Sequence, residues 1–192
     1  MEPPLILASS SPRRRRLLSR LASEFSVVAA AVDESRLPGE RPAAYARRLA
    51  MEKAAWVAAT VGDATVLGAD TAVADGRDTL GKPTDAAAAG RMLQRLAGRW
   101  HLVITAVARV DSVTGTTVVD HTTTAVLLKA LSRAEIHAYV ASGRPMDKAG
   151  SYAIQDTNPS PVAAIVGSET NVVGLPLLLT RCLLGRAPRP GS

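Results

Sequence analysis

Serines and arginines gather near the start of the chain, directly after a short apolar run. Residues 5–16 read Leu-Ile-Leu-Ala-Ser-Ser-Ser-Pro-Arg-Arg-Arg-Arg, and the four apolar residues predict a buried strand. Ser11 followed by Pro12 is typical of a helix N-cap with proline at the first helical position. Four arginines in the first turn would oppose the helix dipole unless an anion neutralised them. Because guanidinium groups bind phosphate with paired hydrogen bonds, the stretch predicts a phosphate site. The alternative is a basic helix face in solvent.

Further charged residues stand at the ends of apolar runs and in short loops. They are the acids Glu34, Asp70 and Asp147 and the bases Lys53, Lys82 and Lys148. Reactions at phosphorus use both kinds of residue. Cations hold the phosphates and absorb developing charge, while a carboxylate binds a divalent cation or takes a proton from water. The combination predicts chemistry on a phosphate chain.

Asp70 is the most informative of these acids. It is expected to close the apolar strand of residues 65–69, and its carboxylate is therefore expected to be shielded from water. Taken alone, an aspartate that only caps a turn at a strand end fits equally well. Lys82 is expected on a short rigid loop and Lys53 inside a helix. For both lysines, a side chain in solvent is the alternative.

Several familiar catalytic motifs are missing. The chain has neither the Gly-x4-Gly-Lys-Ser/Thr phosphate loop nor the Gly-x-Gly-x-x-Gly fingerprint of dinucleotide-binding folds. The three histidines lack the spacing of metal ligands, and the single cysteine, Cys182, cannot supply a zinc site without them. No Gly-x-Ser-x-Gly elbow surrounds the serines of residues 9–11, which disfavours a serine nucleophile.

The composition indicates a globular protein with an anionic partner. The 192 residues are 47% hydrophobic but only 3% aromatic, and the formal charge is +6. This charge suits a nucleotide or a nucleic acid, but the shortage of aromatic side chains for base stacking disfavours nucleic acid. The lone cysteine indicates a reducing compartment. No apolar run approaches the ~20 residues of a membrane span, and no signal-peptide pattern is present. We therefore expect a cytoplasmic protein with no membrane partner.

Strands and helices alternate along the chain without regular strand–helix–strand repeats. Apolar runs and turn pairs predict strands over residues 5–8, 25–32, 65–69 and 162–166, a hairpin over 72–80, and two long strands over 102–110 and 117–128. After the helix that begins at Ser11-Pro12, further helices are predicted over residues 42–61, from Thr84 to Gly98 and from Ser132 to Gly143. A last helix is predicted to begin at Gly174-Leu175-Pro176 and to end at Leu184. This order predicts an α/β fold with a mixed sheet and helices on both sides. We expect a single domain with two lobes over residues 1–185 and a disordered tail over 186–192.

Seven short motifs occur in an order that identifies a family. They are Ser-x-Ser-Pro-Arg-Arg at residues 9–14, Asp33-Glu34, Glu52-Lys53-Ala54, Gly68-Ala69-Asp70-Thr71, Gly81-Lys82-Pro83, Asp147-Lys148-Ala149-Gly150 with Gln155, and Val173-Gly174-Leu175-Pro176. Each motif alone is weak. Together they span residues 5–184 and resemble the Maf proteins, nucleoside triphosphate pyrophosphatases first named as septum-formation inhibitors.

The resemblance implies an elongated mixed α/β fold with a central cleft between two lobes, similar to the inosine triphosphate pyrophosphatases. It also implies a divalent cation (Mg²⁺, Mn²⁺ or Co²⁺) and cleavage between the α and β phosphates, giving a nucleoside monophosphate and pyrophosphate. By the same resemblance Asp70 is the catalytic base, and Glu34 and Asp70 are the metal ligands. The implied substrate-binding residues are Ser9, Ser11, Arg13, Arg14, Lys53 and Lys82. A small-molecule nucleotide is the implied partner, and a homodimer is compatible with it.

Three positions separate two substrate groups in this family, one acting on dTTP and UTP and the other on 7-methyl-GTP. Here they are Arg13, Thr71 and Gln155, which resemble the dTTP/UTP set. An amide such as that of Gln155 offers one donor and one acceptor, matching a carbonyl and the N3–H of uracil or thymine. We therefore expect a dTTP/UTP pyrophosphatase, with modified pyrimidine nucleotides as further candidate substrates. The alternatives are a 7-methyl-GTP pyrophosphatase and a non-catalytic basic regulator that binds nucleotides or nucleic acid.

One departure from the family pattern follows Gln155. The family usually has glycine at the next position, whereas residues 156–161 here read Asp-Thr-Asn-Pro-Ser-Pro. The departure leaves the catalytic set intact and affects the rim of the cleft. If the expected preference for dTTP and UTP fails, a relaxed base selectivity caused by this segment is the alternative.

Overall fold

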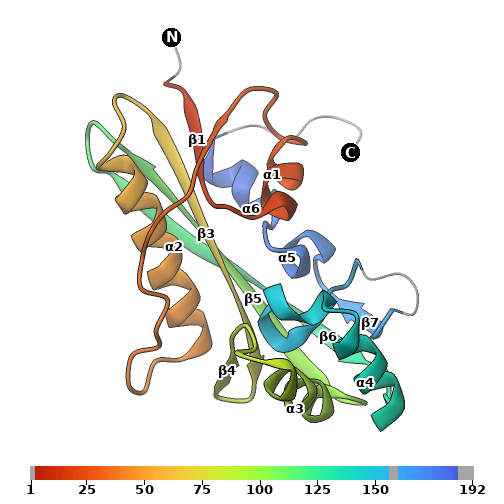
Figure 1. The fold of residues 1–192 in the computed structure, drawn as a ribbon. Helices are drawn as coiled ribbons and strands as arrows, with labels where there is room; N and C mark the ends of the chain where they lie inside the picture. The colour runs from red at the N-terminus through yellow and green to blue at the C-terminus, as the bar shows by residue number, and fades with distance from the viewer. Residues whose placement is uncertain (1–2, 156–159, 186–192) are drawn as a thin grey trace.

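The computed structural model describes residues 3–155 and 160–185, and within these ranges seven strands form one mixed sheet (Figure 1). The order is β2-β1-β3-β5-β6-β7, and the short β4 also pairs with β3. The strands are β1 (Leu5–Ala8), β2 (Ser26–Val28), β3 (Thr65–Asp75), β4 (Asp78–Leu80), β5 (Trp100–Asp111), β6 (Thr117–Leu128) and β7 (Val162–Val166). β1 is parallel to both neighbours, and the remaining pairs are antiparallel. The mixed sheet confirms the predicted fold class.

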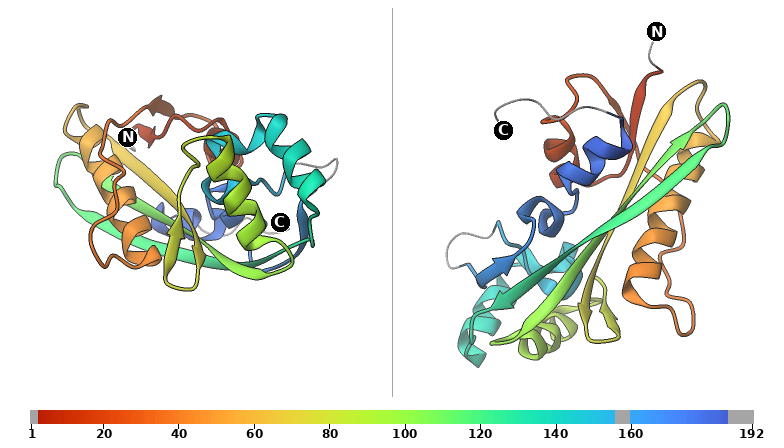
Figure 2. Two further views of the ribbon diagram at one scale, coloured as in Figure 1. Left: turned by 60° about the horizontal axis from the view of Figure 1, so that its bottom comes forward. Right: turned by 180° about the vertical axis from the view of Figure 1, so that it is seen from behind.

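Helices cover both faces of this sheet, as Figure 2 shows from behind. They are α1 (Pro12–Leu18), α2 (Pro42–Ala58), α3 (Ala86–Leu96), α4 (Arg133–Ala141), α5 (Glu169–Val173) and α6 (Leu177–Leu183), with 3₁₀ turns η1 (Arg144–Asp147) and η2 (Ala149–Ser151). Since side chains alternate along a strand, Val66 and Ala72 of β3 pack toward α2. Leu67 and Ala69 pack on the opposite face with Leu175 and the leucines of α1. α3 and α4 build a third cluster at the far end of β5 and β6.

One edge of β3 is left open midway along its length. β1 pairs with it as far as Gly68, and β4 pairs with it only from Val73. Among the described residues, 69–72 therefore have no strand partner on this side, while β5 pairs with the other side. Asp70 and Thr71 lie in this gap. Because consecutive side chains point to opposite faces, the two residues reach toward different layers of helices.

Gly68 allows α2 to lie directly against β3. A Cβ atom at this position would stand 2.2 Å from the carbonyl oxygen of Ala50 and 2.7 Å from the amide nitrogen of Ala54, both in the α2 backbone. Only glycine permits this close approach. Lys53, on the same stretch of α2, is thereby brought to the carboxylate of Asp70.

Several sequence-based boundaries were wrong. The strand predicted to end at Asp70 continues to Asp75, because β3 pairs with β5 along residues 65–74. Asp70 is therefore a mid-strand residue and does not cap a turn. α1 ends at Leu18, so Arg15 and Arg16 occupy its last turn, where the helix dipole favours cations.

Other differences are smaller. α3 is capped by Asp85 rather than Thr84, since the Asp85 carboxylate accepts the amide of Ala88 at 2.7 Å. β2 is shorter than the predicted run over residues 25–32, and α2 ends at Ala58 rather than residue 61. The predicted tail over 186–192 and residues 156–159 of the altered segment lie outside the described residues. None of the helices in the described ranges has the length and hydropathy required of a membrane span.

Candidate active site

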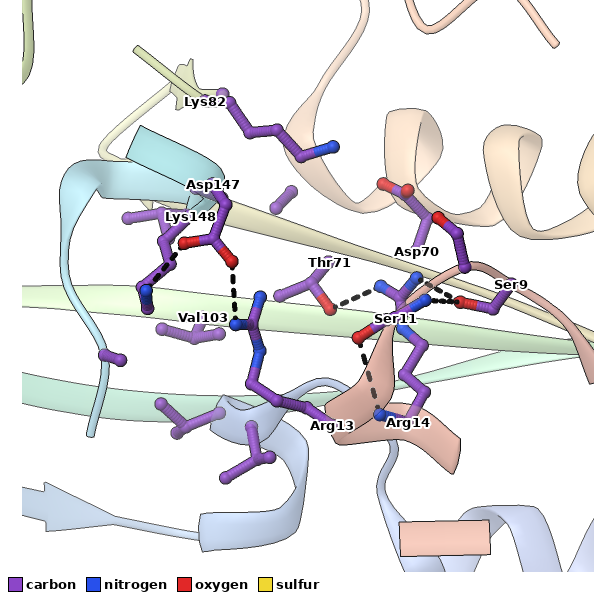
Figure 3. Close-up of a pocket in the computed structure, with 18 of the residues that line it drawn as sticks. Ser9, Ser11, Arg13, Arg14, Asp70, Thr71, Lys82, Val103, Asp147 and Lys148 are labelled. Atoms are coloured by element: carbon purple, nitrogen blue, oxygen red, sulfur yellow. Dashed lines mark hydrogen bonds and ion pairs between the residues drawn. The ribbon is translucent and has the colours of Figure 1, made fainter. Parts of the chain in front are cut away.

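A cavity of about 340 Å³ opens at the free edge of β3. Figure 3 shows its floor and walls. Its lining comes from the loop after β1, from α1, α2 and β3, from residues 81–82, and from the segment around η1 and residues 152–155. The structure brings all the predicted site residues together here, namely Ser9, Ser11, Arg13, Arg14, Glu34, Lys53, Asp70, Thr71, Lys82 and Gln155.

Lys53 joins two carboxylates at the centre of the cavity. Its Nζ lies 2.6 Å from Oδ1 of Asp70 and 2.6 Å from Oε1 of Glu34. Asp70 and Lys53 are both buried, with 7% and 8% of their surface exposed, whereas the Glu34 side chain is 44% exposed. Lys53 is therefore not a solvated helix lysine. It is the partner that makes a buried carboxylate tolerable in mid-sheet.

The two carboxylates differ in their affinity for protons. Burial raises the pKa of Asp70 above its ordinary value, and the negative Glu34 adds to this, while Lys53 and Arg14 oppose it. Burial also disfavours ionisation of Glu34, but the hydrogen bond and charge of Lys53, together with Lys82 and Arg14, hold the pKa of Glu34 below its ordinary value. Neighbouring carboxylates whose pKa values are pushed apart are typical of acid–base sites. Asp70 is the better proton acceptor of the two.

Arg14 is anchored below the cavity by three hydrogen bonds. Its Nε donates to the carbonyl of Gly174 at 2.8 Å, Nη2 to Oγ1 of Thr71 at 3.1 Å, and Nη1 to Oγ of Ser9 at 3.5 Å. Burial lowers the pKa of Arg14, with the charges of Asp70 and Glu34 opposing that effect. Arg14 is thus a fixed cation rather than part of a solvated helix face, and its orientation is set before any ligand arrives.

Two serines shape the loop that leads into α1. The Ser11 hydroxyl accepts the amide of Arg14 at 3.4 Å, which confirms the predicted N-cap. The hydroxyl of Ser9, itself buried, accepts the amide of Ser11 at 3.2 Å. These contacts hold the loop in a tight turn over the cationic end of the cavity.

Arg13 reaches across the cavity to the far wall. Its Nη1 lies 3.0 Å from Oδ2 of Asp147, whose other oxygen lies 2.6 Å from Nζ of Lys148. Lys148 also donates to the carbonyl of Arg144, which fixes its position directly after η1. Lys82 is the most open of the cations, with its side chain 62% exposed and Nζ 3.8 Å from Oε2 of Glu34. Arg13 and Lys82 flank the entrance to the cavity.

The wall opposite the cations is largely apolar. Val73, Val103, Tyr152, Ile154 and Val172 line it, with the exposed Gln155 at its end. Tyr152 is buried, and its hydroxyl lies 2.6 Å from Nε2 of His101. The amide of Ala153 donates to the hydroxyl of Tyr139 at 3.3 Å. These contacts hold the segment that ends in Gln155 against α4 and β5.

Sequence reasoning missed the polar groups beneath the cavity. Tyr45 donates its hydroxyl to the carbonyl of Glu34 at 2.9 Å, and burial, with the charges of Asp70 and Glu34, raises the pKa of Tyr45 to about 12. Thr105 contacts the hydroxyl of Thr71, and Asn171 contacts Thr105 in turn. In the sequence Thr105 reads as an ordinary strand residue, and no element was predicted at Asn171, which lies in α5. The only local signal was the position of Asn171 just before the Val173-Gly174-Leu175-Pro176 motif.

Glu34 and Asp70 supply only some of the ligands that a divalent cation requires. Within the described residues no group of three or more acidic, histidine or cysteine side chains could hold a metal ion. Glu34 and Asp70 nevertheless point at one place, the Nζ of Lys53, where a positive charge is already accommodated. Mg²⁺ is commonly bound by one or two carboxylates together with substrate phosphates and water. The donor set therefore fits a cation that arrives with a phosphate chain.

Fold and cavity together define an α/β protein that can hold a polyphosphate anion beside a buried, lysine-paired carboxylate. Comparison with known proteins agrees with this class. The family model described as "Maf: Maf-like protein" matches residues 4–187. The chain belongs to the Maf family.

The chain is also similar over almost its full length to several curated proteins. It is 51% identical to a protein of Myxococcus xanthus, covering 97% of this chain and 93% of that one. It is 49% identical to a protein of Moorella thermoacetica, covering 94% and 93%, and 48% identical to one of Anaeromyxobacter dehalogenans strain 2CP-1, covering 99% and 97%. All three relatives carry the name dTTP/UTP pyrophosphatase.

Proposed function

We propose that this chain is a nucleoside triphosphate pyrophosphatase that hydrolyses dTTP and UTP to the nucleoside monophosphate and pyrophosphate. The observation that carries the proposal is the buried Asp70, paired with Lys53 at 2.6 Å, in a cavity whose other walls hold Arg13, Arg14 and Lys82. The names of relatives that are about half identical to the chain support the same activity.

Asp70 acts as the general base in this reaction. It takes a proton from a water whose oxygen forms the new bond to the α phosphorus, and the bond from that phosphorus to the α,β-bridging oxygen breaks. Pyrophosphate leaves with the electron pair, and its added charge is stabilised by the surrounding cations. Arg14 is oriented in advance by Gly174, Thr71 and Ser9, so little reorganisation accompanies the reaction.

A divalent cation, Mg²⁺, Mn²⁺ or Co²⁺, belongs to the same proposal. Glu34 and Asp70 would hold it together with phosphate oxygens, and it would supply neutralising charge and a more acidic water. Lys53 contacts both carboxylates in the free protein. It therefore neutralises them until the nucleotide and its cation arrive.

The apolar wall with Gln155 receives the pyrimidine. Valines and Tyr152 provide a surface for a small planar ring, and the Gln155 amide supplies one donor and one acceptor at the rim. The alternative substrate, 7-methyl-GTP, carries a positive charge on its base. The cavity offers no aromatic side chain at position 13, where Arg13 stands instead. That cation would repel the methylated base rather than stack on it.

A panel of nucleotides tests the proposal. Purified protein is assayed for pyrophosphate release from dTTP, UTP, CTP and 7-methyl-GTP with Mg²⁺ and with Mn²⁺. We expect kcat/KM for dTTP and UTP to exceed that for CTP and for 7-methyl-GTP. A preference for 7-methyl-GTP would favour the other branch of the family. Tight nucleotide binding without pyrophosphate release would favour the non-catalytic regulator.

Two further expectations accompany this function. A substrate taken from the nucleotide pool fits the cytoplasmic location expected from the sequence. A homodimer stays a prediction, which sedimentation equilibrium of the purified protein would test.

A further inference from the structure

A chain of hydrogen bonds runs from the floor of the cavity into the interior. Arg14 Nη2 donates to Oγ1 of Thr71 at 3.1 Å, and Oγ1 of Thr71 lies 3.0 Å from Oγ1 of Thr105. The Thr105 hydroxyl in turn donates to the backbone carbonyl of Asn171 at 2.7 Å. Thr105 and Asn171 are fully buried, so these bonds do not compete with water.

The number of protons on each hydroxyl decides which group donates in each of these hydrogen bonds. A threonine hydroxyl has one proton and two lone pairs. The single proton of Thr105 is used at the carbonyl of Asn171, so Thr105 can only accept from Thr71. Thr71 must therefore donate to Thr105, while one of its lone pairs accepts from Arg14. Toward the cavity Thr71 has one lone pair left and no proton.

Asn171 keeps this arrangement from reversing. Its side-chain oxygen accepts the amide of Thr105 at 3.1 Å, and its side-chain nitrogen donates to the Val103 carbonyl and to Oγ1 of Thr124, each at 2.9 Å. With so many bonds to β5 and β6, the carbonyl of Asn171 stays opposite the Thr105 hydroxyl. That carbonyl also accepts the backbone amide of Gly174 at 3.1 Å, which holds it in place. Turning the Thr105 proton away would leave two oxygens 2.7 Å apart with no proton between them, which costs free energy.

Thr71 lies where the two halves of the cavity meet. In Figure 3 it stands between Arg14 on the cationic side and Val103 on the apolar side. Thr71 also lies on the same face of β3 as Val73 of the apolar wall, so its hydroxyl is placed to meet the edge of a base that rests on this wall. A group that can only accept there matches the N3–H of uracil and thymine, which leaves the amide of Gln155 to donate to a ring carbonyl. Cytosine presents a lone pair at N3, which would face the lone pair of Thr71.

We propose that Thr105, held by Asn171, is a positioning residue for base selection. By accepting the hydrogen bond that the Thr71 hydroxyl donates, Thr105 leaves Thr71 able only to accept toward the cavity. The proposal rests on the proposed function and extends it to a residue that does not touch the substrate.

The experiment compares UTP with CTP. Thr105→Val removes the hydroxyl with little change in shape and frees the Thr71 proton to face the cavity. We expect the ratio of kcat/KM for UTP to that for CTP to fall about tenfold, the equivalent of one hydrogen bond gained or lost. Thr105→Ser keeps the hydroxyl and should restore the ratio. Thr180→Val is the matched control. Thr180 is equally buried, but its hydroxyl donates to the carbonyl of Pro176 at the start of α6. The UTP to CTP ratio of this variant should equal that of the wild type.

A second variant covers the case in which Thr105→Val does not fold. Thr71→Val removes the acceptor itself at a half-buried position, and its ratio should fall through the loss of UTP turnover. An unchanged ratio in a folded Thr105→Val protein, or in Thr71→Val, overturns the proposal and leaves the pyrophosphatase assignment standing. A wild-type protein inactive on both dTTP and UTP overturns both.

Discussion

At the scale of single residues, we expect the activity to depend on Asp70 far more than on any acid outside the cavity. We expect Asp70→Asn to lower kcat by about a hundredfold or more, because the proton acceptor is lost. It should also lower the free energy of unfolding by about 1–3 kcal/mol, because the buried Lys53 loses one of its two charged hydrogen-bond partners. The same substitution at an aspartate in solvent would change the free energy of unfolding very little. The loss in Asp70→Asn stays moderate because Lys53 keeps Glu34 as a partner.

Asp75→Asn is the matched control for this measurement. Asp75 lies on the same strand, and its largely buried carboxylate is 2.6 Å from Nε of Arg95, away from the cavity lining. Stopped-flow turnover and urea unfolding of both variants should show a comparable stability loss but a kcat deficit only in Asp70→Asn. A similar kcat in the two variants would remove Asp70 from the role of base.

Arg13 and Arg14 are neighbours in sequence, yet they should respond differently to alanine. Arg14 makes three hydrogen bonds to the protein, including one to the carbonyl of Gly174. Arg14→Ala should therefore raise KM and lower the free energy of unfolding by about 1–3 kcal/mol. The helix dipole alone would predict the opposite change in stability, because it disfavours a cation in the first turn. The partner of Arg13 is Asp147, 64% exposed. Arg13→Ala should therefore raise KM while changing stability by less than about 1 kcal/mol. Kinetics with UTP and thermal unfolding of both variants check this, and equal Tm losses would count against it.

At the scale of elements, the contact of α2 with β3 sets the distance between Lys53 and Asp70. Gly68→Ala would place a Cβ 2.2 Å from the Ala50 carbonyl oxygen, and backbone atoms cannot rotate away. α2 must then shift, and we expect a loss of about 1–3 kcal/mol in stability together with a lower kcat. Gly90→Ala is the control, because no atom lies within 4 Å of a Cβ there. In the interior of α3 it should stabilise the protein by about 0.5–1 kcal/mol. Urea unfolding and UTP turnover of the two variants give the comparison, and a fully active Gly68→Ala would show that α2 does not position Lys53.

Local patterns predicted most elements but not how they meet. Apolar runs located the strands of the sheet, and the Ser-Pro pair located the start of α1. The end of β3 was misplaced because a buried aspartate looks like a strand end, whereas pairing with β5 carries the strand through it. Charged residues at the ends of apolar runs indicated most of the site, and the resemblance gave each residue its role. Neither showed the contacts, which join positions as far apart as Arg13 and Asp147. Thr105 and Asn171 were missed because their importance comes from proton donors and acceptors on other elements.

At the scale of the whole molecule, the cavity lies where three hydrophobic clusters meet. Asp70 and Lys53 stand over the cluster under α2, Arg14 over the cluster that contains Leu17 and Leu175, and Tyr152 belongs to the third cluster. The parts of the site are thus anchored in different regions of the core. A loss of packing in one region should move one wall of the cavity relative to the others.

The third cluster contains a buried histidine that ties stability to pH. His101 is only 4% exposed, and its ring meets Tyr152 edge-on with centroids 5.3 Å apart. Burial lowers the pKa of His101 from 6.5 to about 4, against smaller opposing effects of the Arg99 carbonyl and Asp75. Between these two values the unfolded chain binds a proton that the folded chain does not. The free energy of unfolding should therefore fall as the pH falls from 6.5 toward 4.

His101→Gln isolates this contribution, because glutamine can still accept a hydrogen bond from Tyr152 but does not titrate. Carboxylates titrate in the same pH range in both proteins and cancel in the difference. Urea unfolding from pH 7 to pH 4 should show the wild type losing on the order of 2 kcal/mol more than the variant. Parallel curves would mean that His101 is protonated without cost in the folded protein, in which case water must reach its ring. A steeper wild-type curve would show that His101 stays neutral and shielded from water behind Tyr152, the residue of this pair that lines the cavity.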